Sequence, residues 1–298
     1  MKKALALILT ASLLTGVLTA CGSSEAQTDA AETTTEEAAA EETADTDAQA
    51  ETGDLQVITV AATAVPHAEI LEAAKPILAE QGYDLQVTVF DDYVQPNEVV
   101  EAGDIDCNYF QHIPYLNSYN EERGTHLVSV GEIHYEPIGI YAGTESDLSN
   151  IPDGADIAIP NDTTNEARAL LILQDNGIIT LKEGAGIDAT INDIAENPHN
   201  INFVEMEAAQ VSKVLSEVAF AVINGNYALD AGLNAQTDAL ASETSDSLAA
   251  QTYVNVVVVK EGNEDNEGVK ALVNVLKSDD IKKFIEETYE GAVVPFEG

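Results

Sequence analysis

The chain is poor in cysteine and in basic residues, and each shortage excludes a class of protein. Its 298 residues include two cysteines, so the sequence offers neither a disulfide framework nor a cysteine metal site. Lysine and arginine together number 12, against 53 aspartates and glutamates. The resulting net charge of −41 opposes binding to nucleic acids and other polyanions. We therefore expect no nucleic-acid partner.

Sequence signatures of catalysis and of cofactor binding are also missing. The chain has no G-x-S-x-G elbow, no Walker loop and no G-x-G-x-x-G run. None of its five histidines pairs with another at the spacing of a helical zinc motif, although His134 and Glu136 would share one face of a strand. We expect no catalytic residues, no cofactor and no metal site.

The N-terminus predicts export followed by lipidation. Lys2 and Lys3 precede an uncharged, mostly apolar run over 4–20, which is short for a membrane-spanning helix and typical of a signal peptide over 1–20. The run ends in Leu18-Thr19-Ala20-Cys21, which resembles a bacterial lipobox. The resemblance implies cleavage before Cys21 and a lipid on its sulfur. Ordinary secretion with an unmodified Cys21 is the alternative.

Residues 21–54 are predicted to be a disordered acidic tether. The stretch from 22 to 54 holds 11 acidic residues and no lysine, arginine or aromatic residue, so it cannot build a core. The remaining residues, 55–298, carry 42 acidic and 10 basic side chains. We interpret this excess as a solubility feature that also disfavours an anionic ligand.

Strand and helix patterns alternate through the rest of the chain and predict an α/β fold. Two long β-type segments, 134–142 and 251–260, separate two such series and suggest two lobes joined by two crossings. The first lobe would comprise 55–140 plus 255–298, and the second 141–254. Small ligands bind between domains and at the carboxyl ends of parallel strands, so a central cleft is expected.

A predicted helix start near Thr163 is the first candidate ligand site. Thr163 and Glu166 have the spacing of a capping box, and a helix start offers free amide donors to an anion. Arg168, one turn further on, could grip the same anion through two nitrogens. It is one of only two arginines among 55–298, which favours a specific role over the alternative of a capped surface helix.

Two more segments at predicted strand ends carry polar and aromatic side chains. In 108–115, Phe110 and His112 could wall an apolar slot near Tyr93, or they could belong to the core. In Asn224-Gly225-Asn226-Tyr227, the amides could bind a ligand's charged groups, or the segment could be a plain turn.

These residues together resemble the NlpA/MetQ family of methionine-binding lipoproteins, the substrate-binding components of methionine ABC importers. The resemblance is spread in order over nearly all of 55–298 and is carried by 66–71, 92–97, 108–116, 134–137, 159–173 and 223–228. Two positions depart from the family pattern: Cys107 stands where alanine is usual, and Val65 where glycine is usual. Both departures leave the exact ligand open.

The resemblance implies a two-lobed periplasmic-binding-protein fold, type II-like, with two crossover strands. It further implies that Arg168 pairs with an amino acid carboxylate, that Asn165 and Asn224 bind the zwitterionic head group, and that three side chains surround the thioether: Tyr93, Phe110 and His112. Second-rank candidates are Asn161, Tyr109 and Asn226.

The leading reading is a lipid-anchored receptor on the extracytoplasmic side of the cell membrane. It would capture L-methionine or a close derivative and deliver it to an ABC transporter permease. A receptor for another small amino acid or a sulfonate is the alternative ligand class. A non-transport surface lipoprotein and a secreted enzyme are alternative protein classes, and the missing catalytic motifs speak against the enzyme.

Overall fold

The computed structural model describes residues 55–244 and 248–297. The predicted signal peptide, the lipidation site Cys21 and the acidic tether lie outside these ranges. None of the described helices has the length and hydrophobicity that crossing a membrane requires.

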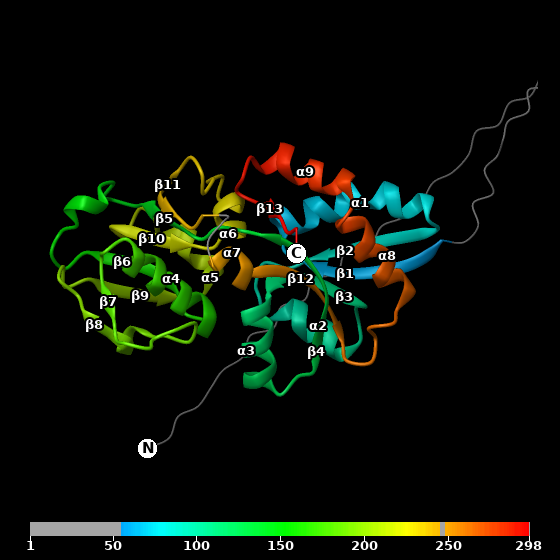
Figure 1. The fold of residues 1–298 in the computed structure, drawn as a ribbon, viewed down its shortest axis with the longest axis horizontal. Coiled ribbons are helices and arrows are strands. Elements are labelled where there is room, and N and C mark those ends of the chain that lie inside the picture. Colours follow the sequence, from blue (N-terminus) through cyan, green and yellow to red (C-terminus); the bar gives the residue numbers. More distant parts are fainter. Residues whose placement is uncertain (1–54, 245–247, 298) are drawn as a thin grey trace, which may run out of the picture. The chain divides into compact units, whose positions relative to one another are not determined.

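A six-stranded sheet forms the first lobe, in the order β13-β4-β12-β3-β1-β2 (Figure 1). Its strands are β1 (Gln56–Ala62), β2 (Tyr83–Val89), β3 (Cys107–His112), β4 (Leu127–Tyr135), β12 (Val254–Lys260) and β13 (Val294–Pro295). β1 pairs in parallel with β2 and β3, whereas β12 is antiparallel to both β3 and β4. The C-terminal part of the chain therefore returns to complete a sheet that the N-terminal part begins.

Helices cover both faces of this sheet because both faces are apolar. Helices α1 (Glu69–Glu80), α8 (Glu267–Leu276) and α9 (Asp279–Tyr289) pack on one face, around a core that includes Val60, Leu78, Leu272 and Ile285. Helices α2 (Gln95–Ala102) and α3 (Ile113–Arg123) pack on the other face, where Val100 and Leu116 meet Val256 and Val258. A single turn, Ala64–Ala68, precedes α1.

A five-stranded sheet forms the second lobe, in the order β11-β5-β10-β6-β9. Its strands are β5 (Gly139–Ala142), β6 (Asp156–Pro160), β9 (Asn202–Met206), β10 (Phe220–Ile223) and β11 (Ala239–Ser242). Helix α4 (Thr163–Asp175) packs on one face, and the short helices α5 (Ala208–Val211) and α6 (Gly225–Asp230) pack on the other. A two-stranded sheet of β7 (Thr180–Leu181) and β8 (Ile194–Glu196) lies beyond α4 in the sequence. Single 3-10 turns complete this lobe at Leu148–Asn150, Ile191–Asp193 and Ser212–Val214.

The chain passes between the two sheets twice. The first passage lies between the end of β4 at Tyr135 and the start of β5 at Gly139. The second lies between β11 and β12 and includes α7 (Leu248–Thr252). Both fall within or beside the segments expected from the sequence, 134–142 and 251–260. The lobe boundaries at 140/141 and 254/255 stay a prediction.

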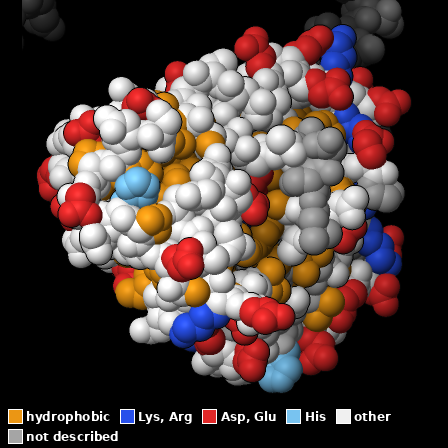
Figure 2. Space-filling view, turned by 60° about the vertical axis from the view of Figure 1, so that its left-hand side comes forward, with side chains coloured by type: hydrophobic (Ala, Val, Ile, Leu, Met, Phe, Trp, Pro, Cys, Tyr) orange, Lys and Arg blue, Asp and Glu red, His pale blue; other side chains and the backbone are white. Residues whose placement is uncertain are grey.

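Several local features agree with the sequence patterns, and one alternative is removed. Helices α8 and α9 are separated at Ser278, whose side chain accepts a hydrogen bond from the Ile281 amide and caps α9. The segment that begins Asn224-Gly225 opens helix α6, so it is not a hairpin turn. The acidic excess is visible on the face drawn in Figure 2, where acidic side chains outnumber basic ones.

Candidate ligand-binding site

A cavity lies between the two lobes, at the carboxyl ends of β3 and β10. The empty space within it, part of which is open to solvent, amounts to about 330 Å³. Its lining comprises Tyr93, Phe110, Gln111, His112, Tyr115, Glu136, Asn165, Arg168, Asn224, Gly225, Asn226 and Asn255. A ligand bound in this cavity would touch both lobes.

The structure brings together seven of the nine residues singled out in the sequence. All six first-rank candidates line the cavity, as does Asn226. Asn161 lines a neighbouring pocket that also contains Tyr93. Tyr109 is fully buried in the core of the first lobe, where its hydroxyl bonds to His134. Their direct contact with a ligand stays a prediction.

Aromatic rings form one wall of the cavity. The ring centroids of Tyr93 and Phe110 lie 5.8 Å apart, and Tyr115 lies 5.6 Å from Tyr93. The Tyr115 hydroxyl donates to the backbone oxygen of Tyr93 at 3.0 Å, which fixes the loop before α2. Tyr115 ends the segment 108–115 but is not among the ligand candidates from the sequence, because a tyrosine at the start of a helix has no distinguishing pattern. The three rings offer an apolar, polarisable surface.

Three polar side chains connect the lobes at the centre of the cavity. The amide oxygen of Asn165 accepts from Asn224 Nδ2 at 2.7 Å and lies 3.1 Å from His112 Nε2. His112 Nδ1 accepts from the Tyr115 amide at 3.1 Å, so its proton resides on Nε2 and points to Asn165. Burial, with help from Arg168, lowers the pKa of His112 to about 3 and keeps the ring neutral. Asn165 is therefore held by donors from both sides.

Arg168 is the buried cation of the cavity, and its main partner is a carboxylate of the protein itself. Its Nε lies 3.0 Å from Glu243 Oε1, and its Nη2 lies 2.5 Å from Glu243 Oε2 and 2.8 Å from the backbone oxygen of Glu136. The guanidinium also lies 4.2 Å from the ring centroid of Tyr253. Burial opposes the charge, but Glu243 outweighs burial and raises the pKa of Arg168. The two-point grip expected for a ligand anion is thus made to Glu243.

The capping box expected at the start of α4 is wrong. The N-cap is Asp162, whose Oδ1 accepts from the Asn165 amide at 3.1 Å and from Asn165 Nδ2 at 2.8 Å. Thr163 instead donates to Glu122 in the first lobe, and Glu166 accepts from the Ile191 amide. Aspartate and threonine are both good caps, and the helix starts one residue earlier than the pattern suggested. An acidic cap also removes the expected anion site at this helix end.

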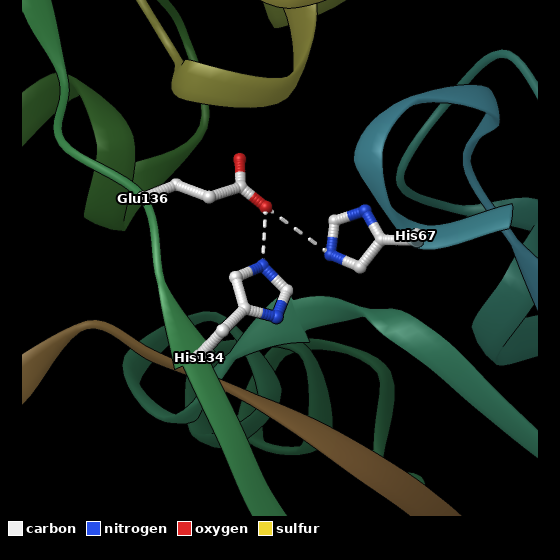
Figure 3. Close-up of side chains that lie close together, drawn as sticks. All are labelled: His67, His134 and Glu136. Atoms are coloured by element: carbon white, nitrogen blue, oxygen red, sulfur yellow. Dashed lines mark hydrogen bonds and ion pairs between the residues drawn. The ribbon is translucent and has the colours of Figure 1, made fainter. Parts of the chain in front are cut away.

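Glu136 brings a second charge to the cavity and forms a cluster with two histidines. The sequence analysis noted only one of these histidines, His134. His134 Nε2 lies 2.7 Å and His67 Nε2 lies 3.3 Å from the same oxygen, Oε1 of Glu136 (Figure 3). His67 belongs to the turn before α1 and His134 to β4, so residues distant in sequence converge here. The sequence analysis placed His134 and Glu136 on one face of a strand, and their side chains do meet, although β4 ends at Tyr135, one residue before Glu136. The sequence holds no signal for His67.

This cluster is the one group of described residues whose atoms could hold a metal ion, since three ligand atoms lie within 4.8 Å of one another. Each imidazole nitrogen nevertheless has a hydrogen-bonding partner in the protein. His67 bonds to Thr63 and Asn255, and His134 bonds to Tyr109 and Glu136. Hydrogen bonds within the protein therefore engage every imidazole nitrogen of the cluster, and the geometry does not require a metal ion.

Two α/β lobes, joined by two passages and enclosing a cavity lined from both sides, define a solute-binding protein of the periplasmic type. The comparisons place the chain within this class. Residues 58–297 match the NlpA lipoprotein family model, and the chain belongs to that family.

The chain is 41% identical over 250 residues to the methionine-binding lipoprotein MetQ of Bacillus subtilis, which covers 83% of this chain and 90% of that protein. Among solved structures, a putative lipoprotein from Ruminococcus gnavus is 67% identical, with a TM-score of 0.80 over 81% of this chain and 100% of that chain. A nutrient-binding protein from Burkholderia cenocepacia bound to methionine is 42% identical, with a TM-score of 0.76 over 80% of this chain and 99% of that chain. These proteins share the fold and nearly the full length of the folded part.

Proposed function

We propose that this protein captures L-methionine, or a close derivative, and presents it to the permease of an ABC transporter. The observation that carries the proposal is a cavity that combines an aromatic wall with one buried positive and one buried negative side chain. Such a cavity complements a small zwitterion with an apolar side chain. The similarity to relatives that bind methionine narrows the choice among such ligands.

The aromatic wall suits a thioether. Sulfur is polarisable and makes favourable contacts with ring edges at about 5 Å. Tyr93, Phe110 and Tyr115 present rings at tilted and edge-on angles, so a flexible methionine side chain can lie among them. Arg168 would attract the ligand carboxylate, and the amides of Asn165 and Asn224 would bond the head group.

Capture proceeds by closure of the lobes. The lobes already touch through side-chain contacts: Tyr93 donates to Asn226 at 2.5 Å, and Tyr227 donates to the backbone oxygen of Asp91 at 3.2 Å. A ligand held between the lobes adds bonds to both and favours the closed form. By population shift, the permease would then select the closed, loaded protein.

The anchoring of the protein follows from its N-terminus. A lipid on Cys21 would hold the protein at the outer side of the cell membrane, and the acidic tether over 21–54 would separate the folded part from the surface. In this role the protein binds its ligand without chemical change and needs no cofactor.

A receptor for a sulfonate is the second ligand class. The folded part carries 42 acidic against 10 basic residues, and this excess disfavours a purely anionic ligand. The cavity also places Glu136 beside the ligand, which a sulfonate without an ammonium group would leave unpaired.

Native mass spectrometry of the soluble part, followed by denaturation, tests the proposal by identifying any released ligand. Thermal unfolding with added ligands measures how strongly each candidate ligand stabilises the protein. L-methionine should raise the melting temperature well above the shifts with alanine, glutamate or a sulfonate, and the shift should grow with concentration. Equal shifts with all of these compounds would contradict the proposal.

A further inference from the structure

Strand β3 is irregular at the point where it reaches the cavity. The side chains of residues 110–112, three in a row, all line the cavity, whereas neighbours in a regular strand point to opposite faces. Two adjacent residues of β12 pair with Gln111 and with Tyr109, which are two positions apart in β3. Phe110 is therefore the extra residue of a β-bulge. Bulges redirect side chains and are frequent beside functional sites.

The bulge brings Gln111 to the same side as Asn108, although residues three apart in a regular strand face opposite sides. Gln111 Nε2 donates to Asn108 Oδ1 at 2.9 Å. Asn97, from the first turn of α2, joins them: its Nδ2 donates to Gln111 Oε1 at 3.0 Å, and its Oδ1 accepts from Gln111 Nε2 at 2.6 Å and from Asn108 Nδ2 at 2.8 Å. Asn97, Asn108 and Gln111 thus form a closed amide triad.

The amide triad is buried and fully paired. Its side chains are at most 3% exposed, and each of their nitrogens and oxygens has a hydrogen-bonding partner. Stability alone does not require such a group, because apolar side chains of the same shape can replace a pair of buried polar partners at little cost. A fully satisfied polar network adds rigidity and a unique arrangement. We therefore looked for what the triad holds in place.

The triad holds both parts of the aromatic wall. Phe110 lies on the bulge between Asn108 and Gln111. Tyr93 lies in the loop directly before α2, and the Asp92 carboxylate in that loop accepts from two backbone amides at the helix start, at 2.7 and 2.8 Å. Because Asn97 fastens the first turn of α2 to β3, the loop is fastened with it. The rings of Tyr93 and Phe110 consequently face each other, with centroids 5.8 Å apart.

The triad acts on the cavity through these rings and not by bonding to a ligand. Asn97 and Asn108 are not among the described residues that line the cavity. Gln111 does line it, but both of its N–H groups are donated to the other two amides. All of these residues belong to the first lobe, so the wall has its shape before the lobes close on a ligand.

We propose that Asn97, Asn108 and Gln111 are positioning residues that fix the aromatic wall. They thereby set the preference for a ligand side chain long enough to reach the wall over a short one. The proposal rests on the proposed function and adds to it the residues that determine selectivity without contacting the ligand's charged groups.

The test is competition titration calorimetry with L-methionine and L-alanine on the wild type and on Asn97→Ala. The variant removes the acceptor that Asn108 and Gln111 share. Methionine affinity should fall at least about fivefold, as expected when one member of a hydrogen-bond network is lost. Alanine, whose single methyl group does not reach the wall, should lose less than about twofold, so the preference for methionine falls.

Asn120→Ala is the matched control. Asn120 lies in α3 of the same lobe, outside the cavity lining, and its side chain also makes three hydrogen bonds: to the Leu127 carbonyl at 2.8 Å, from the Leu127 amide at 3.1 Å and from the Thr125 hydroxyl at 2.8 Å. Its loss should lower the melting temperature and leave the preference for methionine unchanged. A merely structural role of the triad would give the same result for Asn97→Ala.

A double variant separates positioning from general stability. In a Phe110→Ala background the wall is already incomplete, so adding Asn97→Ala should cost little further methionine affinity. Effects that act through one shared element are not additive, whereas independent effects add. Additive losses would show that Asn97 does not act through Phe110 and would overturn the proposal.

A measurement on the wild type keeps the test informative if Asn97→Ala does not fold. The side-chain amide protons of the triad should be protected from hydrogen exchange in the ligand-free protein, and equally so after methionine is added. Nuclear magnetic resonance of protein labelled at asparagine and glutamine measures this protection. Rapid exchange without ligand would show that the triad does not pre-form the wall.

Failure of this proposal is distinct from failure of the proposed function. If the wild type does not bind methionine, the proposed function is wrong. If the wild type binds methionine and folded Asn97→Ala keeps the same preference over alanine, or loses both ligands equally, the triad supports only the fold.

Discussion

The guanidinium of Arg168 lies within hydrogen-bonding distance of both carboxylate oxygens of Glu243, a residue 75 positions away in sequence. Glu243 also accepts from the Tyr135 hydroxyl at 2.6 Å and from the Ile138 amide at 3.1 Å. Arg168 therefore stabilises the second lobe through its ion pair with Glu243 and also supplies the positive charge of the cavity. A variant of Arg168 must affect folding and binding together, and the two effects need separate measurement.

The first prediction separates these two effects. Arg168→Ala should lower the free energy of unfolding by roughly 1–3 kcal/mol, because the Glu243 side chain, which is only 11% exposed, loses its charged hydrogen-bonding partner. Adding Glu243→Gln should recover part of this stability but none of the methionine affinity. Urea unfolding and titration calorimetry measure the two quantities. Arg123→Ala is the control, since the side chain of Arg123 is 51% exposed and its contact with Glu98 is 4.0 Å long. Full methionine affinity in the double variant would show that Arg168 does not bind the carboxylate.

The aromatic wall gives the second prediction. Phe110→Ala should weaken methionine binding by ~1–3 kcal/mol, in line with the loss of buried apolar contact. The loss should be smaller for alanine, which has no side chain to reach the wall. Phe284→Ala, in α9 at the edge of the first-lobe core, should affect stability without changing affinity. An equal loss for methionine and alanine would place the thioether elsewhere.

Stability should fall as the pH falls below neutrality. Burial lowers the pKa of His67 to about 4, and of His112 and His134 to about 3, whereas in the unfolded chain each titrates near 6.5. Between these values the unfolded chain binds more protons, so acid favours unfolding, by at most about 4 kcal/mol per pH unit for three groups. Glu136 and Asp162, whose pKa values burial raises, oppose part of this loss because they hold protons in the fold.

Urea unfolding at pH 7.0 and 5.5 measures this dependence. The free energy of unfolding should differ less between the two pH values when His112 is replaced with glutamine, because one of the three buried histidines no longer contributes. The same replacement at exposed His126 is the control and should leave the difference unchanged. If His112→Gln leaves the difference between the two pH values unchanged, His112 does not give up a proton on folding and its predicted contribution is wrong.

Chelation tests whether hydrogen bonds, and not a metal ion, hold His67, His134 and Glu136 together. Treatment with EDTA should leave both the melting temperature and the methionine affinity unchanged, because hydrogen bonds within the protein engage every nitrogen of the two imidazoles. Loss of stability on chelation, restored by added zinc, would instead assign His67, His134 and Glu136 to an ion.

The N-terminal prediction concerns Cys21. Cys21→Ser should move the protein from the membrane to the soluble fraction, and acyl mass should disappear from its N-terminus. Fractionation of cells and mass spectrometry of the first peptide measure both. A variant that stays with the membrane would contradict the lipidation of Cys21.

The parts of the fold that follow from the sequence are those that depend on neighbouring residues. Alternation and helical spacing predicted the α/β fold, and the two long β-type segments predicted where the chain passes between the sheets. Strand ends also indicated Phe110 and Asn224 as cavity residues, because parallel strands bring their carboxyl ends together. The place of Asn165 in the site is implied only by the family resemblance.

The features that the sequence did not predict depend on contacts between distant residues. Nothing near Glu243 marks it as the partner of Arg168, and nothing near His67 connects it to His134 and Glu136. A local ambiguity explains the wrong cap. Asp162 and Thr163 are adjacent, both residue types cap helices, and the stronger of the two, aspartate, is the one used.

The absence of a side chain at Gly225 has its own consequence for the selection of ligands. A Cβ there would lie 2.7 Å from the Cβ of Glu136, too close for either backbone to remain in place. Gly225→Ala alters no charge and removes no hydrogen-bonding group, yet it would push the carboxylate away from α6. A methyl group at residue 225 would therefore change the shape of the cavity without changing its charge, so this glycine offers a steric way to alter the choice of ligand.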